Sequence, residues 1–417
     1  MKKILILGGA SVHIKLIRAA QKMGLYTIVT DNLRYEESPG KQIANEYWDI
    51  DVFDVSNIVE RARKSKIDGV ISGWLDPCQI PYQEICEKLK MPCYGTREQF
   101  YKMTNKHAFK KMCKECGVDT VLDYSIIDVE NGIVDYPIFV KPVDSRGSRG
   151  QSICCNKKQT TIAIEKAKNE SSNGEILIEK YMEGTDEIQI TYFLIDGMPY
   201  LIRTADSYNG GKNYNLEKVV TCSISPSKYT DEYIATTHQN VVNMFSKLGF
   251  KNGPIFMQGF YDKGKFRFFD PGLRFPGVDY DIIYNEMYNE NLMNMMIDFS
   301  INGKFEKKEI AGDMVHLFGK RAATLFPTIT AGKIKNIIGI DAIKQLKGVF
   351  AISLRHDIGD IIDWTYNVNQ RIAEINVYAD TTDELKEKIK KIKNVLDVID
   401  IDGKSMIYGL LNEEIII

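Results

Sequence analysis

Two stretches, FVKPVDSRGSRG (Phe139–Gly150) and FFDPGLRFPG (Phe268–Gly277), place charged side chains directly after an apolar, strand-like run. In the first, Lys141 ends the apolar run and a loop of serine, glycine and arginine follows. Glycines let a backbone bring its N–H groups against phosphate oxygens, and a serine adds a donor. In the second, Asp270 and Arg274 follow the strand. These residue types suit a site that holds a nucleotide triphosphate and moves its terminal phosphate.

The composition is that of an ordinary globular protein with 417 residues, 44% of them hydrophobic and 26% charged. This length allows two or three domains with their own cores. The net charge of −2 gives no electrostatic reason to expect nucleic acid or a membrane surface as partner. The start MKKILILGGA predicts a strand rather than a signal peptide, because Gly8 and Gly9 interrupt the apolar run. We therefore expect a cytoplasmic protein.

Eight cysteines include one C-x-x-C pair, Cys113 and Cys116. The pair lies in a lysine-rich helical stretch, and no second pair at metal-binding spacing accompanies it. A structural zinc site or a redox pair is the less favoured alternative. We interpret the cysteines as reduced thiols.

Strand and helix patterns alternate over residues 2–95 and predict a parallel, doubly wound sheet. A dinucleotide site, with Asp31 on the ribose, is one interpretation. The G-x-G-x-x-G fingerprint is missing, however, since the turn reads GGASVH over residues 8–13. We favour a Rossmann-like domain that packs against a catalytic one.

The rest of the chain divides into two further predicted units. Residues 96–135 have helical periodicity, with a helix that begins at Asn105, and 136–305 are rich in strands, with a helix from Asp231 to Gly249. Residues 306–417 indicate a small α+β unit. We therefore predict domains at 1–95, 96–305 and 306–417, in a mixed α/β and α+β fold.

A hairpin of PIFMQGFYD and KFRFFDPG carries the candidate metal ligands. A three-residue loop with Gly264 left-handed would place Gln258 opposite Phe268, with Asp270 on the same face two residues further along. An amide oxygen and a carboxylate are ligands that Mg²⁺ accepts. The hairpin therefore predicts a magnesium site at Gln258 and Asp270.

In order and spacing these features resemble the ATP-grasp superfamily of ligases, of the biotin-carboxylase and carbamoyl-phosphate-synthase type. The resemblance covers the whole chain, with an N-terminal pre-ATP-grasp domain and a tail similar to that of L-amino acid ligases. The stretch ILIEKYMEG is similar to the adenine-reading hinge. The resemblance implies an ATP site formed by Lys106, Lys141, Gly147, Ser148, Glu179, Lys180, Met182 and Glu187.

Within that site the resemblance assigns roles. Lys106 and Lys141 hold phosphates, Glu179 lies beside the adenine amino group, and Glu187 accepts from the ribose hydroxyls. Many members carry Glu-x-Asn-x-Arg in the metal loop. This chain has aspartate at the first position, keeps Arg274, and has Gly272 in place of the asparagine. One tightly held Mg²⁺ is therefore expected, with Mn²⁺ as a substitute.

The implied activity is an ATP-dependent carboxylate–amine ligase that forms an acyl phosphate from a small carboxylate such as an amino acid. Arg274 and Lys141 are the implied catalytic residues. A carbamoyl-phosphate-synthase-like enzyme is one alternative, and a degenerate ATP-binding sensor or scaffold, favoured by Gly272, is another. The implied partners are small-molecule substrates rather than nucleic acid or membrane. A homodimer, and the identity of the acid and the amine, stay open.

Overall fold

The N-terminal sheet is parallel, with strand order β3-β2-β1-β4. In the computed structural model, residues 1–73, 75–143, 150–171, 173–211, 216–277, 280–310, 315–365 and 368–416 are described. The elements of this first unit are β1 (Lys3–Leu7), η1 (Ser11–His13), α1 (Ile14–Lys22), β2 (Tyr26–Thr30), η2 (Tyr35–Glu37), α2 (Pro39–Ile43), β3 (Glu46–Trp48), α3 (Val55–Ser65), β4 (Gly69–Ser72), η3 (Asp76–Cys78) and α4 (Gln79–Leu89). The predicted parallel sheet is confirmed.

A small antiparallel sheet with strand order β5-β8-β6-β7 follows two helices. Its region comprises α5 (Arg97–Thr104), α6 (Lys106–Glu115), β5 (Asp123–Tyr124), α7 (Ile126–Asn131), β6 (Ile138–Pro142), β7 (Ser152–Cys154), α8 (Lys157–Glu170) and β8 (Ile176–Lys180). Asn105 caps α6, because its side-chain oxygen accepts from the Ala108 amide at 3.0 Å. This cap makes Lys106 the first residue of the helix.

The large sheet has eight antiparallel strands in the order β13-β12-β9-β10-β11-β14-β19-β17. Its first five strands and the helices beside them are β9 (Asp186–Ile195), β10 (Met198–Gly211), β11 (Leu216–Ser225), α9 (Thr230–Thr236), α10 (His238–Lys247), β12 (Gly253–Asp262) and β13 (Lys265–Gly272). The predicted helix from Asp231 to Gly249 is two helices, which meet at Thr237. Val241, Met244 and Phe245 form the buried face of the second.

The hairpin of β12 and β13 differs from the prediction in its register. Asp262 pairs with Lys265, so the turn has two residues, Lys263 and Gly264, both with positive φ. The predicted three-residue loop was therefore wrong. A register shift between Gln258 and Gly259 leaves Phe269 as an extra residue, and Gln258 lies directly opposite Asp270.

The C-terminal segment supplies the other three strands of the large sheet and a layer above it. Its elements are α11 (Tyr280–Tyr288), α12 (Leu292–Asn302), η5 (Leu317–Gly319), β14 (Arg321–Leu325), β15 (Thr328–Ile329), β16 (Gly332–Ile338), α13 (Ile340–Lys344), β17 (Val349–Leu354), β18 (Ile361–Ile362), η6 (Val368–Gln370), β19 (Ala373–Ala379), α14 (Thr382–Val395), β20 (Asp397–Asp400), β21 (Ile407–Tyr408) and η7 (Glu413–Ile415). Because the large sheet runs across residue 305, the division into domains stays a prediction.

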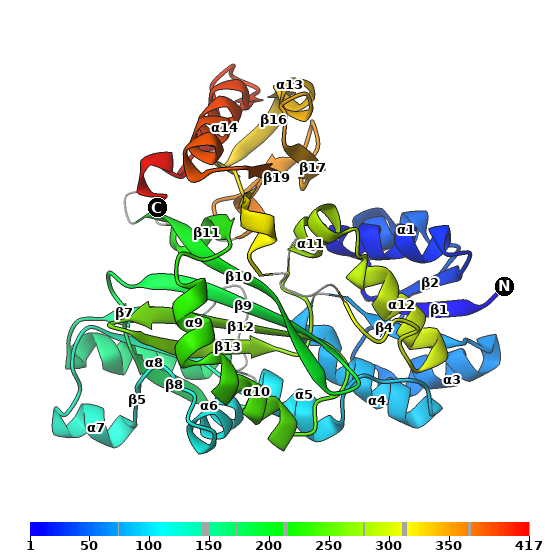
Figure 1. Ribbon diagram of the computed structural model, residues 1–417, viewed down its shortest axis with the longest axis horizontal. Coiled ribbons are helices and arrows are strands. Elements are labelled where there is room, and N and C mark those ends of the chain that lie inside the picture. Colours follow the sequence, from blue (N-terminus) through cyan, green and yellow to red (C-terminus); the bar gives the residue numbers. More distant parts are fainter. Residues whose placement is uncertain are drawn as a thin grey trace.

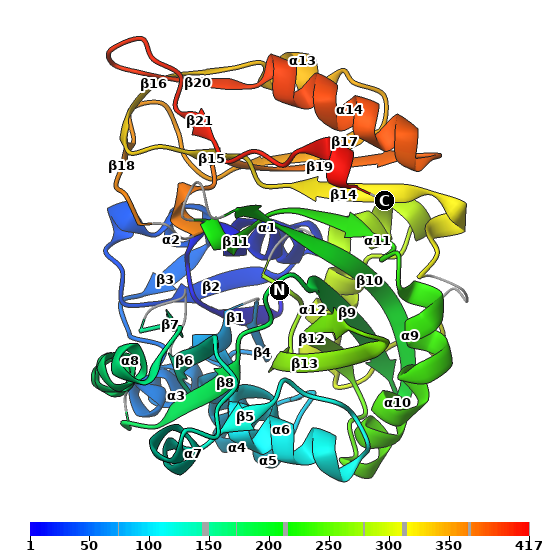
Figure 2. The ribbon, with the colours of Figure 1, turned by 90° about the vertical axis from the view of Figure 1, so that its left-hand side faces the viewer.

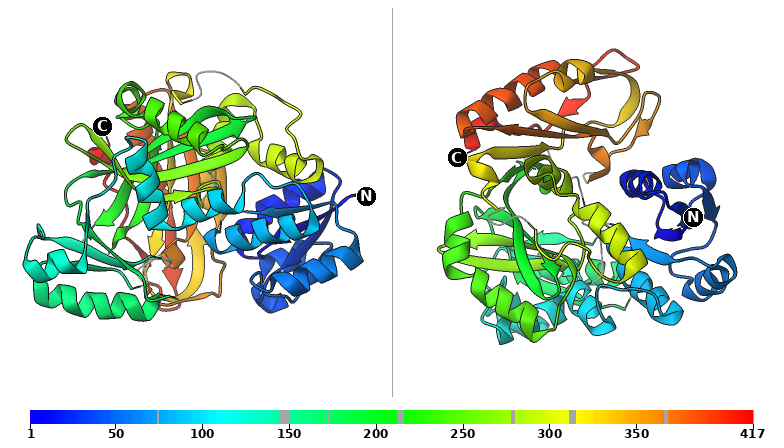
Figure 3. Two further views of the ribbon diagram at one scale, coloured as in Figure 1. Left: turned by 90° about the horizontal axis from the view of Figure 1, so that it is seen from below. Right: turned by 45° about the vertical axis from the view of Figure 1, so that its right-hand side comes forward.

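Figure 1 shows the parallel sheet at one side of the large sheet and the small sheet with α7 and α8 at the other. In Figure 2 the C-terminal elements form a layer across the top of the molecule. Both views of Figure 3 show α12 returning to the N-terminal unit, where it packs on β4 and α1. A Cβ atom on Gly69 would lie 2.4 Å from the Ser300 carbonyl oxygen, so only glycine permits this contact. Within the described ranges, every helix is too short or too polar to cross a membrane.

Candidate nucleotide and metal site

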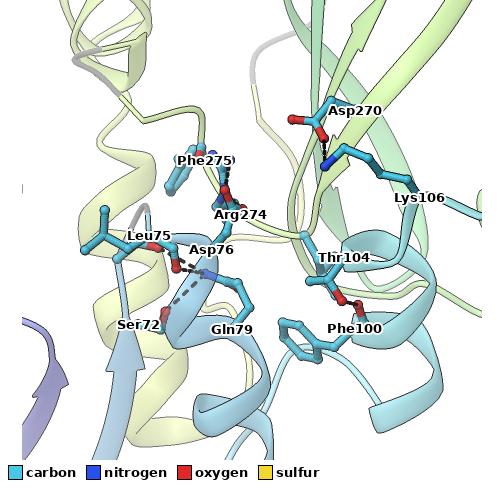
Figure 4. Close-up of polar contacts among 12 residues, drawn as sticks. Ser72, Leu75, Asp76, Gln79, Phe100, Thr104, Lys106, Asp270, Arg274 and Phe275 are labelled. Atoms are coloured by element: carbon cyan, nitrogen blue, oxygen red, sulfur yellow. Dashed lines mark hydrogen bonds and ion pairs between the residues drawn. The ribbon is translucent and has the colours of Figure 1, made fainter. Parts of the chain in front are cut away.

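An ion pair between Lys106 and Asp270 joins the start of α6 to the end of β13 (Figure 4). The Lys106 Nζ lies 2.9 Å from the Asp270 Oδ1. Burial lowers the pKa of Lys106, but the charge and hydrogen bond of Asp270, together with the charges of Asp76 and Glu179, outweigh burial and raise the pKa. The structure thus brings together a lysine and an aspartate that the sequence analysis assigned to phosphate and to metal.

A second charged cluster lies on the small sheet. The Lys141 Nζ, on β6, is 2.5 Å from a carboxylate oxygen of Glu179, on β8. The other oxygen of Glu179 binds Lys110, which also contacts Asp123. Lys141, Glu179 and Lys110 are all buried. The Glu179 carboxylate therefore lies between two lysines, a contact that the sequence analysis did not predict for this residue.

The two clusters are close enough to interact. The Lys141 ammonium lies 5.4 Å from the ring centre of Phe269, the residue before Asp270. Burial would raise the pKa of Asp270, but the charges of Lys106, Lys141 and Arg274 hold it below its ordinary value. Burial lowers the pKa of Lys141, although Glu179 opposes this. The Asp270 carboxylate thus pairs with the cation of α6 and lies within electrostatic reach of cations from β6 and from the loop after β13.

Lys110 is a site residue that the sequence analysis missed. It lies one helical turn after Lys106, a spacing that places both side chains on one face of α6. That spacing was the available signal. Glu179 is buried, so its negative charge needs a partner at all times. With two lysines, one can move to another group while the other still neutralises the carboxylate.

Replacing Lys110 with methionine is expected to lower the free energy of unfolding by about 3 kcal/mol, the scale for breaking a buried ion pair from one side. The neighbouring Lys111 is exposed on the same helix, and Lys111→Met is the matched control, with an effect below about 0.5 kcal/mol. Thermal and denaturant unfolding of both variants measure the difference. Equal stability of the two variants would contradict the buried pair.

Arg274 lies in the loop after β13 and binds Asp76 of the N-terminal unit (Figure 4). Its Nε donates to Asp76 Oδ1, and its Nη2 donates to Asp76 Oδ2 at 2.9 Å. Its Nη1 donates to the Phe275 carbonyl oxygen at 2.9 Å. Burial lowers the pKa of Arg274, but the charge and hydrogen bonds of Asp76, together with the charge of Asp270, outweigh burial and raise the pKa. Asp76 was missed because nothing near it in the sequence points to so distant a partner.

Gly272 has a packing role that the sequence did not reveal. A Cβ atom there would lie 3.1 Å from the Arg274 Cγ and 3.2 Å from its Nε. The Arg274 guanidinium also lies 5.5 Å from the ring centre of Phe256, the residue that pairs with Gly272. The glycine thus lets Arg274 fold back over the hairpin toward Asp76.

The oxygen atoms near Asp270 fit a magnesium ion. Gln258 faces Asp270 across the hairpin, and its Nε2 lies 3.4 Å from Glu187 Oε1. One amide and two carboxylates are therefore adjacent, and all three carry the hard oxygens that Mg²⁺ selects. The described residues contain no group of three His, Cys, Asp or Glu side chains that could hold a metal by itself. Nucleotide phosphates and water would have to complete the shell.

Burial raises the pKa of Glu187 from its ordinary value of 4.5 to about 7, and Asp270 adds to the effect although Asn209 opposes it. Between these two values the folded chain holds a proton that the unfolded chain releases. Stability therefore falls as pH rises through this window. Glu187→Gln, which stays neutral, is expected to raise the melting temperature at pH 8 and to have little effect near pH 4.5. Calorimetry across this range tests it, with the exposed Glu175→Gln as control. An equal effect of Glu187→Gln at both pH values would contradict the raised pKa.

Lys180 and Met182, the residues predicted to read adenine, make contacts within the protein. The Lys180 amide donates to the Leu122 carbonyl at 2.9 Å, and its side chain binds Asp135 at 2.5 Å. The Met182 carbonyl accepts from the Thr185 hydroxyl at 2.9 Å. Their roles toward adenine stay a prediction. Gly147 and Ser148 lie outside the described residues.

Two less favoured hypotheses, a dinucleotide site at Asp31 and a zinc site at Cys113, can be compared with the structure. The Asp31 carboxylate accepts from the Ser38 hydroxyl at 2.8 Å and pairs with the buried Lys41 at 2.9 Å, so it is already occupied inside the N-terminal unit. Cys113 is buried, and burial raises the pKa of its thiol. Neither observation favours a dinucleotide or a zinc site.

Known proteins resemble this chain in sequence over one segment and in fold over almost its whole length. Residues 105–263 match the family model described as the carbamoyl-phosphate synthase L chain, ATP binding domain. The chain is 24% identical over 258 residues to formate-dependent phosphoribosylglycinamide formyltransferase of Prochlorococcus marinus (strain NATL1A). That match covers 60% of this chain and 64% of the relative, so the chain spans less than two thirds of its length.

Solved structures are similar over almost the whole chain. L-amino acid ligase from Bacillus licheniformis has a TM-score of 0.78 at 17% identity, over 96% of this chain and 99% of that one. The biotin carboxylase domain dimer of Hydrogenobacter thermophilus 2-oxoglutarate carboxylase, in complex with MgADP, has a TM-score of 0.74 at 17% identity. The match covers 97% of this chain and 91% of that one. The predicted fold is confirmed. The chain has the predicted ATP-grasp fold, and its residues 105–263 are similar to the ATP-binding domain of the carbamoyl-phosphate synthase L chain.

Proposed function

We propose that the chain is an ATP- and Mg²⁺-dependent carboxylate–amine ligase. The observation that carries the proposal is the Lys106–Asp270 ion pair, beside which Lys141 and Arg274, held by Glu179 and Asp76, are close enough to lower the pKa of Asp270. Three half-buried or buried cations around one candidate metal ligand match the charge of a metal-bound triphosphate. The names of two similar proteins refer to formate and to amino acids, and both compounds carry a carboxylate.

The proposed reaction has two steps. An oxygen of the substrate carboxylate attacks the γ-phosphorus of ATP, the bond to the β-phosphate oxygen breaks, and ADP leaves. The amine nitrogen then attacks the acyl carbon, and phosphate leaves as the C–N bond forms. In both steps the protein acts by positioning charge and excluding water.

Each side chain has a part in this scheme. Lys106 and Lys141 hold phosphates, and Arg274 stabilises the charge that develops on the transferring phosphoryl group. When Lys141 turns to a phosphate, Lys110 keeps the buried Glu179 compensated. Asp270 and Gln258 would hold Mg²⁺, which neutralises charge on the phosphate oxygens when bound.

Phosphate release from Mg-ATP, measured with separate pools of amino acids and other small carboxylates, tests the proposal. We expect phosphate release to depend on one pool. We also expect a hydroxamate to form when hydroxylamine is added. A protein that binds ATP and yields no ADP with any pool would instead be the sensor or scaffold.

Lys141→Ala is expected to weaken Mg-ATP binding by about 1.5–3 kcal/mol, the scale of a hydrogen bond to a charged group. The variant is expected to fold, because Lys110 still neutralises Glu179. Calorimetric titration with ATP measures the loss, and Lys158→Ala, an exposed lysine on α8, is the control. Unchanged affinity in folded Lys141→Ala would remove Lys141 from the phosphate site.

A further inference from the structure

Two free cysteines, Cys86 and Cys93, lie together where helix α4 ends. Lys90 follows the helix with a left-handed φ of 56°, and the Met91 amide donates to the Cys86 carbonyl oxygen at 2.9 Å. This pairing turns the chain back over the last turn of the helix. Cys93 comes two residues later, and a hydrogen bond joins its sulfur atom to the Cys86 thiol. Both side chains pack in the same apolar core.

The two thiols differ in what can reach them. Cys86 is fully buried, whereas Cys93 is partly exposed. Burial raises the pKa of Cys86. The hydrogen bond from Cys86, with a second from Tyr82, holds the pKa of Cys93 below its ordinary value, although burial opposes this. Because the thiolate is the nucleophilic form of cysteine, an oxidant in solution reacts first at Cys93, and Cys86 is placed to react with the product.

The segment that contains Cys93 packs against the loop after β13. The Tyr94 hydroxyl donates to the Leu273 carbonyl oxygen at 2.8 Å. A Cβ atom on Gly95 would lie 2.8 Å from the Leu273 Cδ2, so the two backbones approach closely. The Cys93 Sγ lies 3.2 Å from the Gly95 carbonyl oxygen. Cys93 and the two residues after it therefore support the residue that precedes Arg274.

We propose that Cys86 and Cys93 form a peroxide-sensitive thiol pair, which closes to a disulfide and changes the loop that carries Arg274. The Cys93 thiolate attacks one oxygen of hydrogen peroxide, an S–O bond forms, the O–O bond breaks, and hydroxide leaves. The Cys86 sulfur then attacks the Cys93 sulfur, the S–S bond forms, and the S–O bond breaks. The hydroxyl group leaves as water with the proton of Cys86. The two thiols lose two electrons, and the peroxide gains them.

Closure of the bond requires a movement at Cys93. A disulfide holds its sulfur atoms about 2.05 Å apart, which is closer than two thiols can approach without a bond. Cys86 is held in a regular helix, whereas Cys93 lies outside the helices and strands, so Cys93 moves toward α4. Tyr94 and Gly95 follow it, and their contacts with Leu273 loosen. The redox state of the thiol pair thus reaches the loop after β13.

Peptide mapping after mild oxidation tests the disulfide. The full chain is treated with a small excess of hydrogen peroxide, alkylated, and digested without reductant. We expect the peptides of Cys86 and Cys93 to be joined with the loss of two hydrogen atoms, and to separate again with dithiothreitol. Cys155→Ser, which removes an exposed thiol, is the control and is expected to form the same cross-link. A chain in which both thiols stay reduced, or in which Cys113 and Cys116 join instead, would overturn the proposal.

Single variants test the order of the two thiols. In Cys86→Ser the second step is blocked, so a sulfenic acid is expected to accumulate on Cys93 and to react with dimedone. In Cys93→Ser the buried Cys86 is expected to stay unlabelled. Thermal unfolding checks that each variant is folded, and Cys86→Ala replaces Cys86→Ser if the serine is not tolerated. Labelling of Cys86 in the second variant, or no labelling of Cys93 in the first, would contradict the assigned order.

Hydrogen exchange tests the link to the loop without turnover, and so stays valid if the proposed ligase function is wrong. The amides of Leu273, Arg274 and Phe275 are expected to exchange about fivefold faster in the cross-linked chain than in the reduced chain. Dithiothreitol is expected to restore the slower rate. Cys93→Ser, treated with peroxide in the same way, is expected to show no change. Equal exchange of the loop in the reduced and cross-linked chains would show that the disulfide does not act on Arg274.

Discussion

Arg274→Ala is expected to reduce acid-dependent phosphate release by about 10²–10³-fold, the effect of removing one group that stabilises a developing negative charge. The interaction is worth most in the transition state, when the phosphoryl group lies between donor and acceptor oxygens. ATP binding is expected to change little, because Lys106 and Lys141 still hold the phosphates. Steady-state phosphate release and titration with a non-hydrolysable ATP analogue measure the two effects separately.

The variant is expected to fold, since the Asp76 that it leaves unpaired is 40% exposed and can be hydrated. Arg267→Ala is the matched control on β13. Arg267 pairs with Asp262 at 3.1 Å, near the turn of the hairpin. Arg274→Lys keeps the charge but loses the two-pronged geometry, and is expected to restore only a part of the activity. Retention of more than about a tenth of the activity in Arg274→Ala would contradict a role in the transition state.

The residues of this site could be predicted from sequence where a local pattern marks them. Lys141 ends a strand, Lys106 begins a capped helix, and Asp270 ends the second strand of a hairpin. The positions of Lys141 and Asp270 follow from the patterns of their own segments, whereas Lys106 was singled out only by the family resemblance. That Lys106 contacts Asp270 could not be predicted, because the contact depends on how α6 packs against β13. The prediction named the two residues and missed their ion pair.

The register of the hairpin shows a second limit. The turn Lys263-Gly264 and the bulge at Phe269 each change the pairing by one residue. The sequence marks the turn with a glycine, but the extra residue of the bulge, Phe269, is itself neither glycine nor proline. The predicted pair Gln258 and Phe268 was wrong for this reason. The prediction that Gln258 and Asp270 share one face is confirmed by their direct pairing.

Gly272 shows how a missing ligand can be misread. From sequence, the glycine indicates only that an asparagine oxygen is lost. In the structure the same position lies under the Arg274 side chain, where a Cβ atom would come within 3.1 Å of Cγ. A side chain at 272 would require the Arg274 side chain to shift by a few tenths of an ångström. The glycine is therefore part of how this chain holds its arginine, which weakens its value as a sign of lost catalysis.

Asp270→Asn is expected to lower acid-dependent phosphate release at least about 100-fold, because it removes the main anionic ligand for Mg²⁺. The substitution keeps the shape of the side chain, and Lys106 keeps an oxygen acceptor. The free energy lost is therefore electrostatic in origin. Phosphate release across a range of Mg²⁺ concentrations measures it, with Asp262→Asn at the far end of the same hairpin as control.

Nucleotide binding by the same variant separates a metal ligand from a structural carboxylate. Asp270 lies among Lys106, Lys141 and Arg274 and partly cancels their charge. Without it, ATP in the presence of a chelator is expected to bind as tightly as to the wild type or more tightly, because Lys106 then faces the phosphates without its competing anion. Mg-ATP is expected to bind more weakly, because the metal has lost a ligand. This opposite response requires that Asp270 act on both the cations and the metal. Loss of binding under both conditions would mean that Asp270 only supports the fold, and full activity would place the metal elsewhere.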